Sequence, residues 1–277
     1  MAALDYEAEY NNRKRVPEHV GLMTRWAADS LKTRDALSPY KELAYGGKER
    51  ERYDLFSTGQ RGHSTPVVVY IHGGYWQRGD RKDYSFVART FVANGMDVVV
   101  PSYTLAPQAS IREILEETRR CLVAVWKRLG RRPVVVGHSA GGHLAAALLA
   151  TDWSAYAGVP DDLVRAAYSI SGVFELEPLV QTSLNEALRL DVAEARAMSP
   201  LLWTPPKKDR WFVASVGGDE SREFLRQSLA VAGHWSKAGV KAECVVVPNA
   251  NHFTIVEELA NADSAMFHRI AQMARAG

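Results

Sequence analysis

Residues 133–150 read PVVVGHSAGGHLAAALLA, and the expected architecture of the chain follows from this segment. A short β-branched run leads into the pentapeptide Gly137-His138-Ser139-Ala140-Gly141, and a helix-forming run of alanine and leucine follows directly. Glycines on both sides of Ser139 allow a sharp turn without the clash of a Cβ atom. A serine at such a turn, between a strand and a helix, presents its hydroxyl above the sheet, as a nucleophile would. The alternative interpretation is a glycine-rich turn with an incidental serine.

The rest of the chain alternates between two kinds of segment. Short β-branched runs predict strands buried on both faces, and apolar residues at helical spacing predict helices between them. The β-branched runs are Val67–Ile71, Val98–Val100 and Val134–Val136. Further strands are expected at Ala166–Ile170, Trp211–Val216 and Ala242–Val247, and the expected helices are Phe86–Val92, Ile111–Val125, Gly142–Ala150 and Glu223–Lys237. This alternation predicts an α/β fold, with a mostly parallel central sheet and helices on both faces.

Two segments lie outside this alternation. They are an N-terminal extension, up to about Lys48, and a cap-like insertion from about Glu177 to Pro206. A length of 277 residues allows one domain or two, but no Gly/Ser-rich or Pro-rich linker divides the chain, so we expect a single domain. Insertions over the carboxyl ends of the strands often shape a binding site, and a plain surface excursion is an equally good interpretation.

The composition excludes several classes of protein. The chain has 34 Lys and Arg and 32 Asp and Glu, a net charge of +2, and no basic stripe, which argues against a nucleic-acid partner. The longest apolar run, Leu144–Ala150, is too short to cross a bilayer, and the acidic N-terminal region does not fit a secretory signal, so we expect a cytoplasmic protein. Cys121 and Cys244 form no C-x-x-C pair, so we expect two buried thiols and no metal or cofactor.

A second glycine-rich segment follows the predicted strand Val67–Ile71. It consists of His72, Gly73, Gly74, Tyr75 and Trp76. This segment resembles the oxyanion loop of α/β-hydrolases, in which glycines let backbone amides turn toward the reacting carbonyl. The resemblance implies that the amides of Gly74, Tyr75 and Ala140 bind an oxyanion and that His72 holds the loop by hydrogen bonding. The alternative is a purely structural turn.

A serine nucleophile needs a base, and α/β-hydrolases order these residues along the chain as serine, acid and histidine. His252 fits the base, because it follows the predicted strand Ala242–Val247 through a turn-rich loop. His234 and His268 also come after the serine, but both lie within helical patterns.

Two adjacent carboxylates compete for the role of the acid. Asp219 and Glu220 both follow the predicted strand Trp211–Val216. Aspartate is the commoner residue in this role, and either carboxylate would also suit the first turn of the helix that comes next. From these residues alone the choice stays open.

The same motifs resemble one group of α/β-hydrolases, the kynurenine formamidases, or arylformamidases. The likeness runs from about Tyr6 to the last helix. Its most specific parts are the HGGYW segment, similar to the HGGxW motif of that family, and GHSAGGHL at residues 137–144. The run SGVFELEPL at residues 171–179, Asn185 and Ser199-Pro200 also match.

The resemblance bears on the acid as well. The family's aspartate is followed by a string that this chain matches at Ser221, Glu223, Phe224, Arg226, Gln227 and Ser228. This alignment implies that Glu220, rather than Asp219, completes a triad with Ser139 and His252, which departs from the family's pattern.

The family resemblance implies a serine hydrolase that cleaves N-formyl-L-kynurenine to L-kynurenine and formate in tryptophan degradation, without a cofactor. A carboxylesterase acting on short-chain acyl esters is the alternative, because the same triad cleaves esters. A catalytically silent hydrolase-fold binding protein is the third hypothesis. Tyr75, Trp76, Trp153 and Phe174 are candidates for an aromatic cleft, and core filling is an equal interpretation for them. The substrate is a small molecule in each enzymatic hypothesis, and a homodimer is left open.

Overall fold

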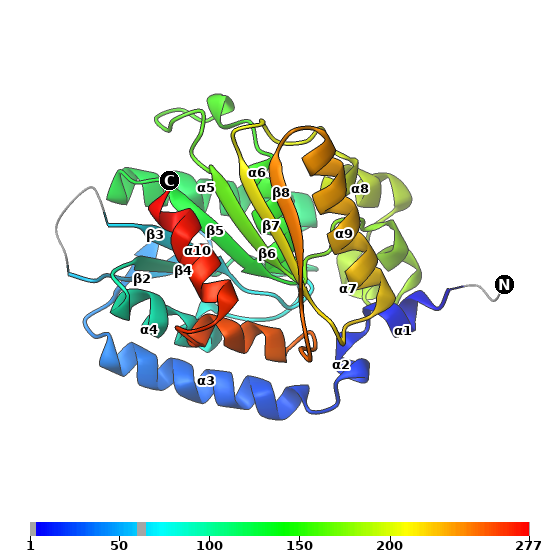
Figure 1. The fold of residues 1–277 in the computed structure, drawn as a ribbon, viewed down its shortest axis with the longest axis horizontal. Helices are drawn as coiled ribbons and strands as arrows, with labels where there is room; N and C mark the ends of the chain where they lie inside the picture. The colour runs from blue at the N-terminus through cyan, green and yellow to red at the C-terminus, as the bar shows by residue number, and fades with distance from the viewer. Residues whose placement is uncertain (1–3, 60–64, 277) are drawn as a thin grey trace.

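The computed structural model describes residues 4–59 and 65–276. One eight-stranded sheet runs through it in the order β1-β2-β4-β3-β5-β6-β7-β8 (Figure 1). Neighbouring strands from β4 to β8 pair in parallel. These strands are β3 (Val67–Ile71), β4 (Asp97–Pro101), β5 (Pro133–His138), β6 (Ala166–Ile170), β7 (Trp211–Gly217) and β8 (Lys241–Val247). The predicted α/β fold with a mostly parallel sheet is therefore confirmed.

Two further strands extend the sheet beyond β4. They are β1 (Lys41–Ala44) and β2 (Arg52–Phe56), and β2 pairs antiparallel with both β1 and β4. The sequence analysis missed both strands. The reason for β1 is that it reads KELA and is largely exposed, so it lacks the β-branched, buried pattern of the central strands. The N-terminal extension thus contributes an edge strand.

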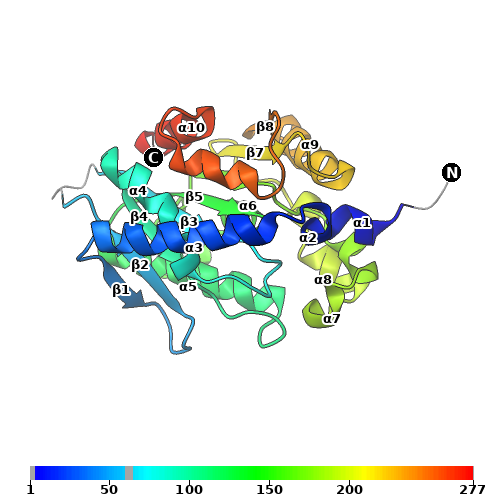
Figure 2. The same ribbon diagram turned by 90° about the horizontal axis from the view of Figure 1, so that it is seen from below.

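Helices cover both faces of the sheet because alternate residues of each strand point to opposite sides. In β3, Val67 and Val69 pack in one core, whereas Val68 and Tyr70 pack in the other. The first core is covered by α5 (Ile111–Leu129), α6 (Ala140–Leu149) and α9 (Arg222–Lys237), and the second by α3 (His19–Ala36), α4 (Phe86–Ala93) and α10 (Ala265–Arg275). Figure 2 shows α3 lying lengthwise along the molecule, next to α4.

Short helices and helical turns connect the longer elements. They are α1 (Tyr6–Tyr10), α2 (Asn12–Arg15), η1 (Arg81–Tyr84), η2 (Trp153–Ala155), η3 (Glu177–Gln181), α7 (Asn185–Leu188), α8 (Val192–Ala197), η4 (Pro200–Leu202) and η5 (Thr254–Ala260). The predicted insertion holds η3, α7, α8 and η4, and α1 packs against η3 and α9 (Figures 1 and 2). The N-terminal extension and the insertion are therefore in contact with each other.

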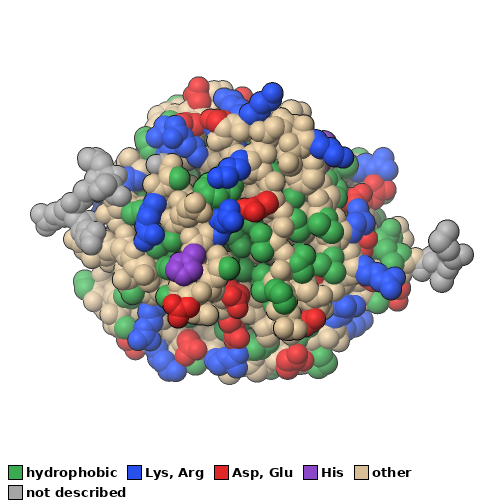
Figure 3. Space-filling model, in the orientation of Figure 1, with side chains coloured by type: hydrophobic (Ala, Val, Ile, Leu, Met, Phe, Trp, Pro, Cys, Tyr) green, Lys and Arg blue, Asp and Glu red, His purple; other side chains and the backbone are tan. Residues whose placement is uncertain are grey.

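Basic and acidic side chains are interspersed on the face seen in Figure 3. Across residues 4–59 and 65–276, none of the helices combines the length and the apolar character needed to cross a bilayer.

Both cysteines are free, but Cys244 is only partly buried, because it lies on the edge strand β8. The prediction of two buried thiols is therefore wrong for Cys244.

The turn between β5 and α6 is packed too closely for ordinary side chains. Ser139 has φ 56° and ψ −119°, a conformation that costs a residue with a Cβ atom about 1–3 kcal/mol. A Cβ atom on Gly137 would lie 2.0 Å from the carbonyl oxygen of Gly141, and one on Gly141 would lie 2.0 Å from that of Ile71. Glycine is therefore required at both positions for α6 to begin directly beneath Ser139.

We predict opposite effects for two glycine-to-alanine substitutions. Gly141→Ala should destabilise the protein by at least about 1–3 kcal/mol, because the new methyl group meets backbone that cannot move aside. Gly233→Ala, in the middle of α9, meets nothing within 4 Å and should stabilise the protein by up to about 1 kcal/mol. Urea unfolding of the two variants measures both effects, and equal stability of the two would refute the packing argument.

Candidate active site

Three side chains from the ends of neighbouring strands form one hydrogen-bonded chain. Ser139 follows β5, Glu220 follows β7 and His252 follows β8. His252 Nε2 lies 3.0 Å from Ser139 Oγ, and His252 Nδ1 lies 2.7 Å from Glu220 Oε2. All three residues are buried, with 2–7% of their surface exposed. The arrangement is that of nucleophile, base and orienting acid.

The structure places Glu220, and not Asp219, against the histidine. Glu220 Oε1 accepts hydrogen bonds from the amide of Gly217 (2.7 Å) and from Ser171 Oγ (2.5 Å), which leaves Oε2 for His252. Asp219 is exposed, and its amide donates to the carbonyl of Ala250. The three donors around Glu220 fix the position and the orientation of its carboxylate.

A second histidine, His138, holds the loop that carries His252. His138 Nε2 donates to the carbonyl oxygen of His252 at 2.8 Å, and the two rings lie 4.8 Å apart. Burial, and then the nearby His252, hold the pKa of His138 well below its usual value, so that ring is neutral. A neutral ring with its proton on Nε2 has a bare Nδ1, and this atom has no hydrogen-bond partner among the described residues. Phe224 packs its edge against His252 from another side.

The glycine-rich loop after β3 lies directly beside the nucleophile. A Cβ atom on Gly73 would come within 2.9 Å of Ser139 Cβ. Gly74, Tyr75 and Trp76 all have positive φ, which turns this segment back on itself. Within residues 4–59 and 65–276, the amides of Gly74, Tyr75 and Ala140 donate to no protein oxygen, so they are available to an oxyanion.

His72 holds the same loop from inside the protein. Its Nδ1 donates to the carbonyl oxygen of Gly73 at 2.8 Å, and the hydroxyl of Tyr103 donates to the carbonyl oxygen of His72 at 3.1 Å. Burial lowers the pKa of His72 to about 4, so this ring is neutral near pH 7. The ring is stacked on Tyr103, with centroids 4.5 Å apart.

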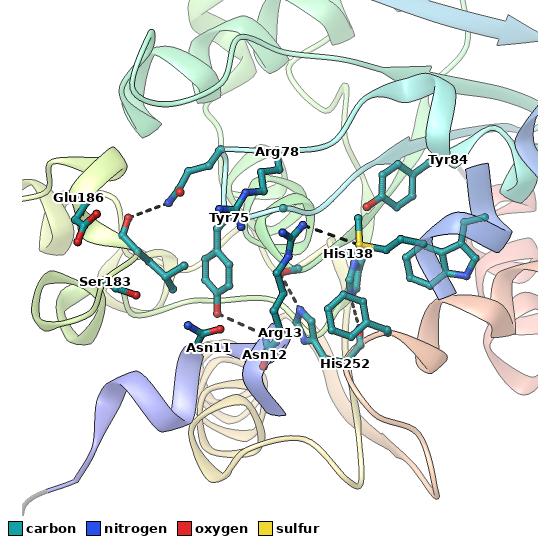
Figure 4. Close-up of a pocket in the computed structure, with 17 residues that line it drawn as sticks. Asn11, Asn12, Arg13, Tyr75, Arg78, Tyr84, His138, Ser183, Glu186 and His252 are labelled. Atoms are coloured by element: carbon teal, nitrogen blue, oxygen red, sulfur yellow. Dashed lines mark hydrogen bonds between the residues drawn. The ribbon is translucent and has the colours of Figure 1, made fainter. Parts of the chain in front are cut away.

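A cavity of about 270 Å³ opens at Ser139 and His252 (Figure 4). Of the four aromatic candidates from the sequence, Tyr75 lines it, whereas Trp76, Trp153 and Phe174 are buried in the core. The other lining residues are Asn11, Asn12, Arg13, Met23, Trp26, Gly74, Gln77, Arg78, Tyr84, His138, Ser183, Leu184, Glu186 and Phe253. The N-terminal extension and the insertion both contribute to this wall.

Tyr75 joins the N-terminal segment to the oxyanion loop. Its hydroxyl donates to the carbonyl oxygen of Tyr10 at 2.5 Å and accepts from Asn12 at 3.5 Å. The hydroxyl of Tyr10 in turn donates to Glu223 Oε2 at 2.7 Å, on α9. These contacts fix α1 and α2 over the nucleophile.

Glu7 joins the N-terminal segment to the insertion. Its carboxylate accepts from the amide and the hydroxyl of Ser183, both at 2.9 Å, and also from Asn11 and Lys14. Hydrogen bonds from Asn11 and then from Ser183 lower the pKa of Glu7 to about 2. The contact between the N-terminal segment and the insertion therefore depends on an ionised carboxylate that lies outside the cavity lining.

Comparison with known proteins identifies the family. A model of the α/β hydrolase fold matches residues 68–256. A kynurenine formamidase of Salmo salar is 33% identical over 238 residues, which are 83% of this chain and 80% of that protein. The chain belongs to the kynurenine formamidase family of α/β-hydrolases. A kynurenine formamidase of Drosophila melanogaster is 28% identical over 90% of this chain and 86% of its own length.

Solved structures agree on the fold. A candidate thioesterase from Silicibacter sp. superposes with a TM-score of 0.87 at 30% identity, over 97% of this chain and 100% of that chain. An esterase from Pyrobaculum calidifontis has a TM-score of 0.71 at 18% identity, over 92% and 90%. The family resemblance inferred from the HGGYW and GHSAGGHL segments is thus confirmed.

Sequence reasoning missed much of the cavity wall. Trp26, Tyr84 and Phe253 supply aromatic surface, and Arg13 and Arg78 supply positive charge. The sequence offers one usable signal for Arg78, which follows the HGGYW segment by two residues. The position of Arg13 depends on the tertiary contacts of Tyr75 and Glu7, which no local pattern encodes.

We predict that Glu220→Gln lowers kcat/KM about 10⁴-fold, because the glutamine oxygen accepts from Gly217 and Ser171 while its NH2 group donates to His252 Nδ1 and so holds the histidine in the wrong tautomer. Asp219→Asn is the matched control and should keep activity close to that of the wild type, because Asp219 is exposed and lies outside the hydrogen-bonded chain. Steady-state kinetics decides, and loss of activity in Asp219→Asn with normal activity in Glu220→Gln would reverse the assignment.

The lowered pKa of Glu7 predicts a pH-dependent contribution to stability. A carboxyl group with a pKa of about 2 in the folded protein and 4.5 when unfolded stabilises the fold above about pH 4.5, and this contribution is lost as the pH falls toward 2. Glu7→Gln should therefore be less stable than the wild type at pH 7, with a gap that narrows at pH 3. Urea unfolding at both pH values tests this. Exposed Glu49→Gln is the control, and an equal gap at both pH values would contradict the prediction.

Proposed function

We propose that this protein is a serine hydrolase that cleaves N-formyl-L-kynurenine to L-kynurenine and formate. The observation that carries the proposal is the hydrogen-bonded chain Ser139–His252–Glu220, which opens into a cavity in a member of the kynurenine formamidase family. Each catalytic element that the reaction requires, a nucleophile, a base, an orienting acid and free amides, is present at one place.

In the first half of the reaction, Ser139 Oγ attacks the formyl carbon while His252 Nε2 takes the hydroxyl proton. The carbonyl oxygen becomes an oxyanion and accepts hydrogen bonds from the amides of Gly74, Tyr75 and Ala140. Glu220 stabilises the imidazolium through Nδ1–H. His252 then protonates the departing arylamine nitrogen, the C–N bond breaks, and Ser139 carries a formyl ester.

In the second half, water replaces the arylamine. His252 Nε2 takes a proton from the water, whose oxygen attacks the formyl ester, and a second oxyanion occupies the same amides. The ester bond breaks, His252 returns the proton to Ser139 Oγ, and formate leaves. The balance is one amide plus one water giving one amine and one formate, without a redox change.

The cavity wall suits an aromatic formamide. Trp26, Tyr75, Tyr84 and Phe253 provide apolar ring surface, and Asn12 and Gln77 provide polar groups near it. A carboxylesterase is the second candidate, because the same residues would cleave an ester, and esterases share the fold. The two activities differ in the leaving group. An arylamine must be protonated by His252 before it departs, whereas a phenolate leaves without a proton.

We predict that kcat/KM for N-formyl-L-kynurenine exceeds that for p-nitrophenyl acetate at equal pH, and that Ser139→Ala abolishes both activities. The comparison is made with purified protein by following the absorbance of kynurenine and of p-nitrophenolate. A ratio strongly in favour of the ester would refute the formamidase proposal and support the carboxylesterase. Acyl thioesters belong in the same panel, since the relative from Silicibacter sp. is a candidate thioesterase.

A further inference from the structure

Two arginines line the cavity that holds the nucleophile. Arg13 comes from α2 and Arg78 from the loop that follows the oxyanion segment, and Figure 4 shows them approaching the cavity from opposite sides. Neither residue takes part in the hydrogen-bonded chain of Ser139, His252 and Glu220. The mechanism therefore leaves both positive charges unused.

Neither guanidinium has an acidic partner in the part of the chain that the structure describes. Every ion pair there involves other cations, and the hydrogen bond of the Arg13 side chain is a weak one, from Nη2 to Met23 Sδ at 4.0 Å. Arg13 is half-buried, and a partly desolvated charge without a counter-charge is unfavourable. Burial, and then the charge of Arg78, lower the pKa of Arg13, so the two cations repel each other in the free protein. An anion between them would relieve this repulsion.

The remaining charged groups of the wall do not supply that anion. Glu186 lines the cavity, but it is exposed and lies well apart from Arg13 in Figure 4. Glu220 is held behind His252 by three hydrogen bonds. His138 is neutral because burial lowers its pKa. The field between Arg13 and Arg78 is therefore positive.

The backbone at both arginines is tied to the oxyanion loop. The amide of Arg78 donates to the carbonyl oxygen of Gly74 at 3.1 Å, so its backbone belongs to the turn that carries the oxyanion amides. Arg13 follows Asn12, whose side chain donates to the hydroxyl of Tyr75 at 3.5 Å. Both side chains therefore start from backbone that is held next to the loop beside Ser139.

We infer that Arg13 and Arg78 form a carboxylate subsite, which binds the anionic end of the substrate while its formamide lies at Ser139. Arginine suits this role, because its planar fork of N–H donors matches the two oxygens of a carboxylate. The inference rests on the proposed function and deepens it. It assigns the substrate to the class of aryl formamides that carry a free carboxylate and separates these from neutral aryl formamides and esters.

The kinetic test uses two substrates that differ in one group. N-formylkynuramine is N-formyl-L-kynurenine without the carboxylate. The quantity compared is the ratio of kcat/KM for N-formyl-L-kynurenine to kcat/KM for N-formylkynuramine, which should exceed one in the wild type. Arg13→Gln and Arg78→Gln should each lower this ratio about 10- to 100-fold, mainly by raising KM for the carboxylate-bearing substrate. Arg13→Lys should restore part of the ratio, since it keeps the charge but loses the fork. Arg15→Gln is the matched control, because Arg15 lies on the same short helix but is exposed and outside the cavity wall, and its ratio should stay that of the wild type.

A binding measurement separates failure of the subsite from failure of the proposed function. L-Kynurenine and kynuramine, which also differ only in the carboxylate, are titrated calorimetrically into the wild type, Arg13→Gln, Arg78→Gln and Arg15→Gln. Tighter binding of L-kynurenine that is lost in the first two variants supports the subsite, even if no formamide is cleaved. Equal binding of both ligands by the wild type, or a preference for L-kynurenine that survives in both Arg13→Gln and Arg78→Gln, overturns it.

Discussion

The backbone of Ser139 is the constraint on which the site depends. A left-handed conformation at a residue with a Cβ atom is unfavourable by about 1–3 kcal/mol, so the surrounding structure must hold it. Two contacts do so: the amide of Ser139 donates to the carbonyl oxygen of Ile170 at 2.8 Å, and its carbonyl oxygen accepts from His143 at 3.0 Å. Gly141 packs against the backbone of Ile71, the residue directly before the oxyanion loop, so the same turn also positions that loop. Ser139 and the loop that carries the amides of Gly74 and Tyr75 are therefore positioned by the same packing.

Glu220 is positioned in a similar way, by a neighbouring residue with positive φ. Ser171 also has positive φ, its amide donates to Ser215 at 2.7 Å, and its hydroxyl donates to Glu220. One oxygen of Glu220 is thereby saturated by donors from the ends of β6 and β7, and the other is directed at His252. These bonds hold the carboxylate of the glutamate in one orientation against His252.

The central sheet and the triad could be predicted from the sequence, because they follow from local patterns. Buried β-branched runs predicted β3 and β5 at or within two residues of their bounds, the strand-to-helix turn predicted Ser139, and the order of serine, acid and histidine predicted His252. The cavity wall could not be predicted in this way. Four- and five-residue helices such as α1 and α2 have no periodicity to detect, and their position depends on contacts with Tyr75 and Ser183, which are far away in the sequence. Trp76 was assigned to the core or the cleft with equal weight, and only its burial decides for the core.

The central claim is that Ser139 is an activated nucleophile, and covalent labelling tests it most directly. The protein is treated with a fluorophosphonate probe at neutral pH, digested, and mapped by mass spectrometry. Our account predicts a stoichiometric adduct on the peptide that contains Ser139, no adduct in Ser139→Ala, and much slower labelling in His252→Ala. An unlabelled wild-type protein, or an adduct on a different serine, would contradict it.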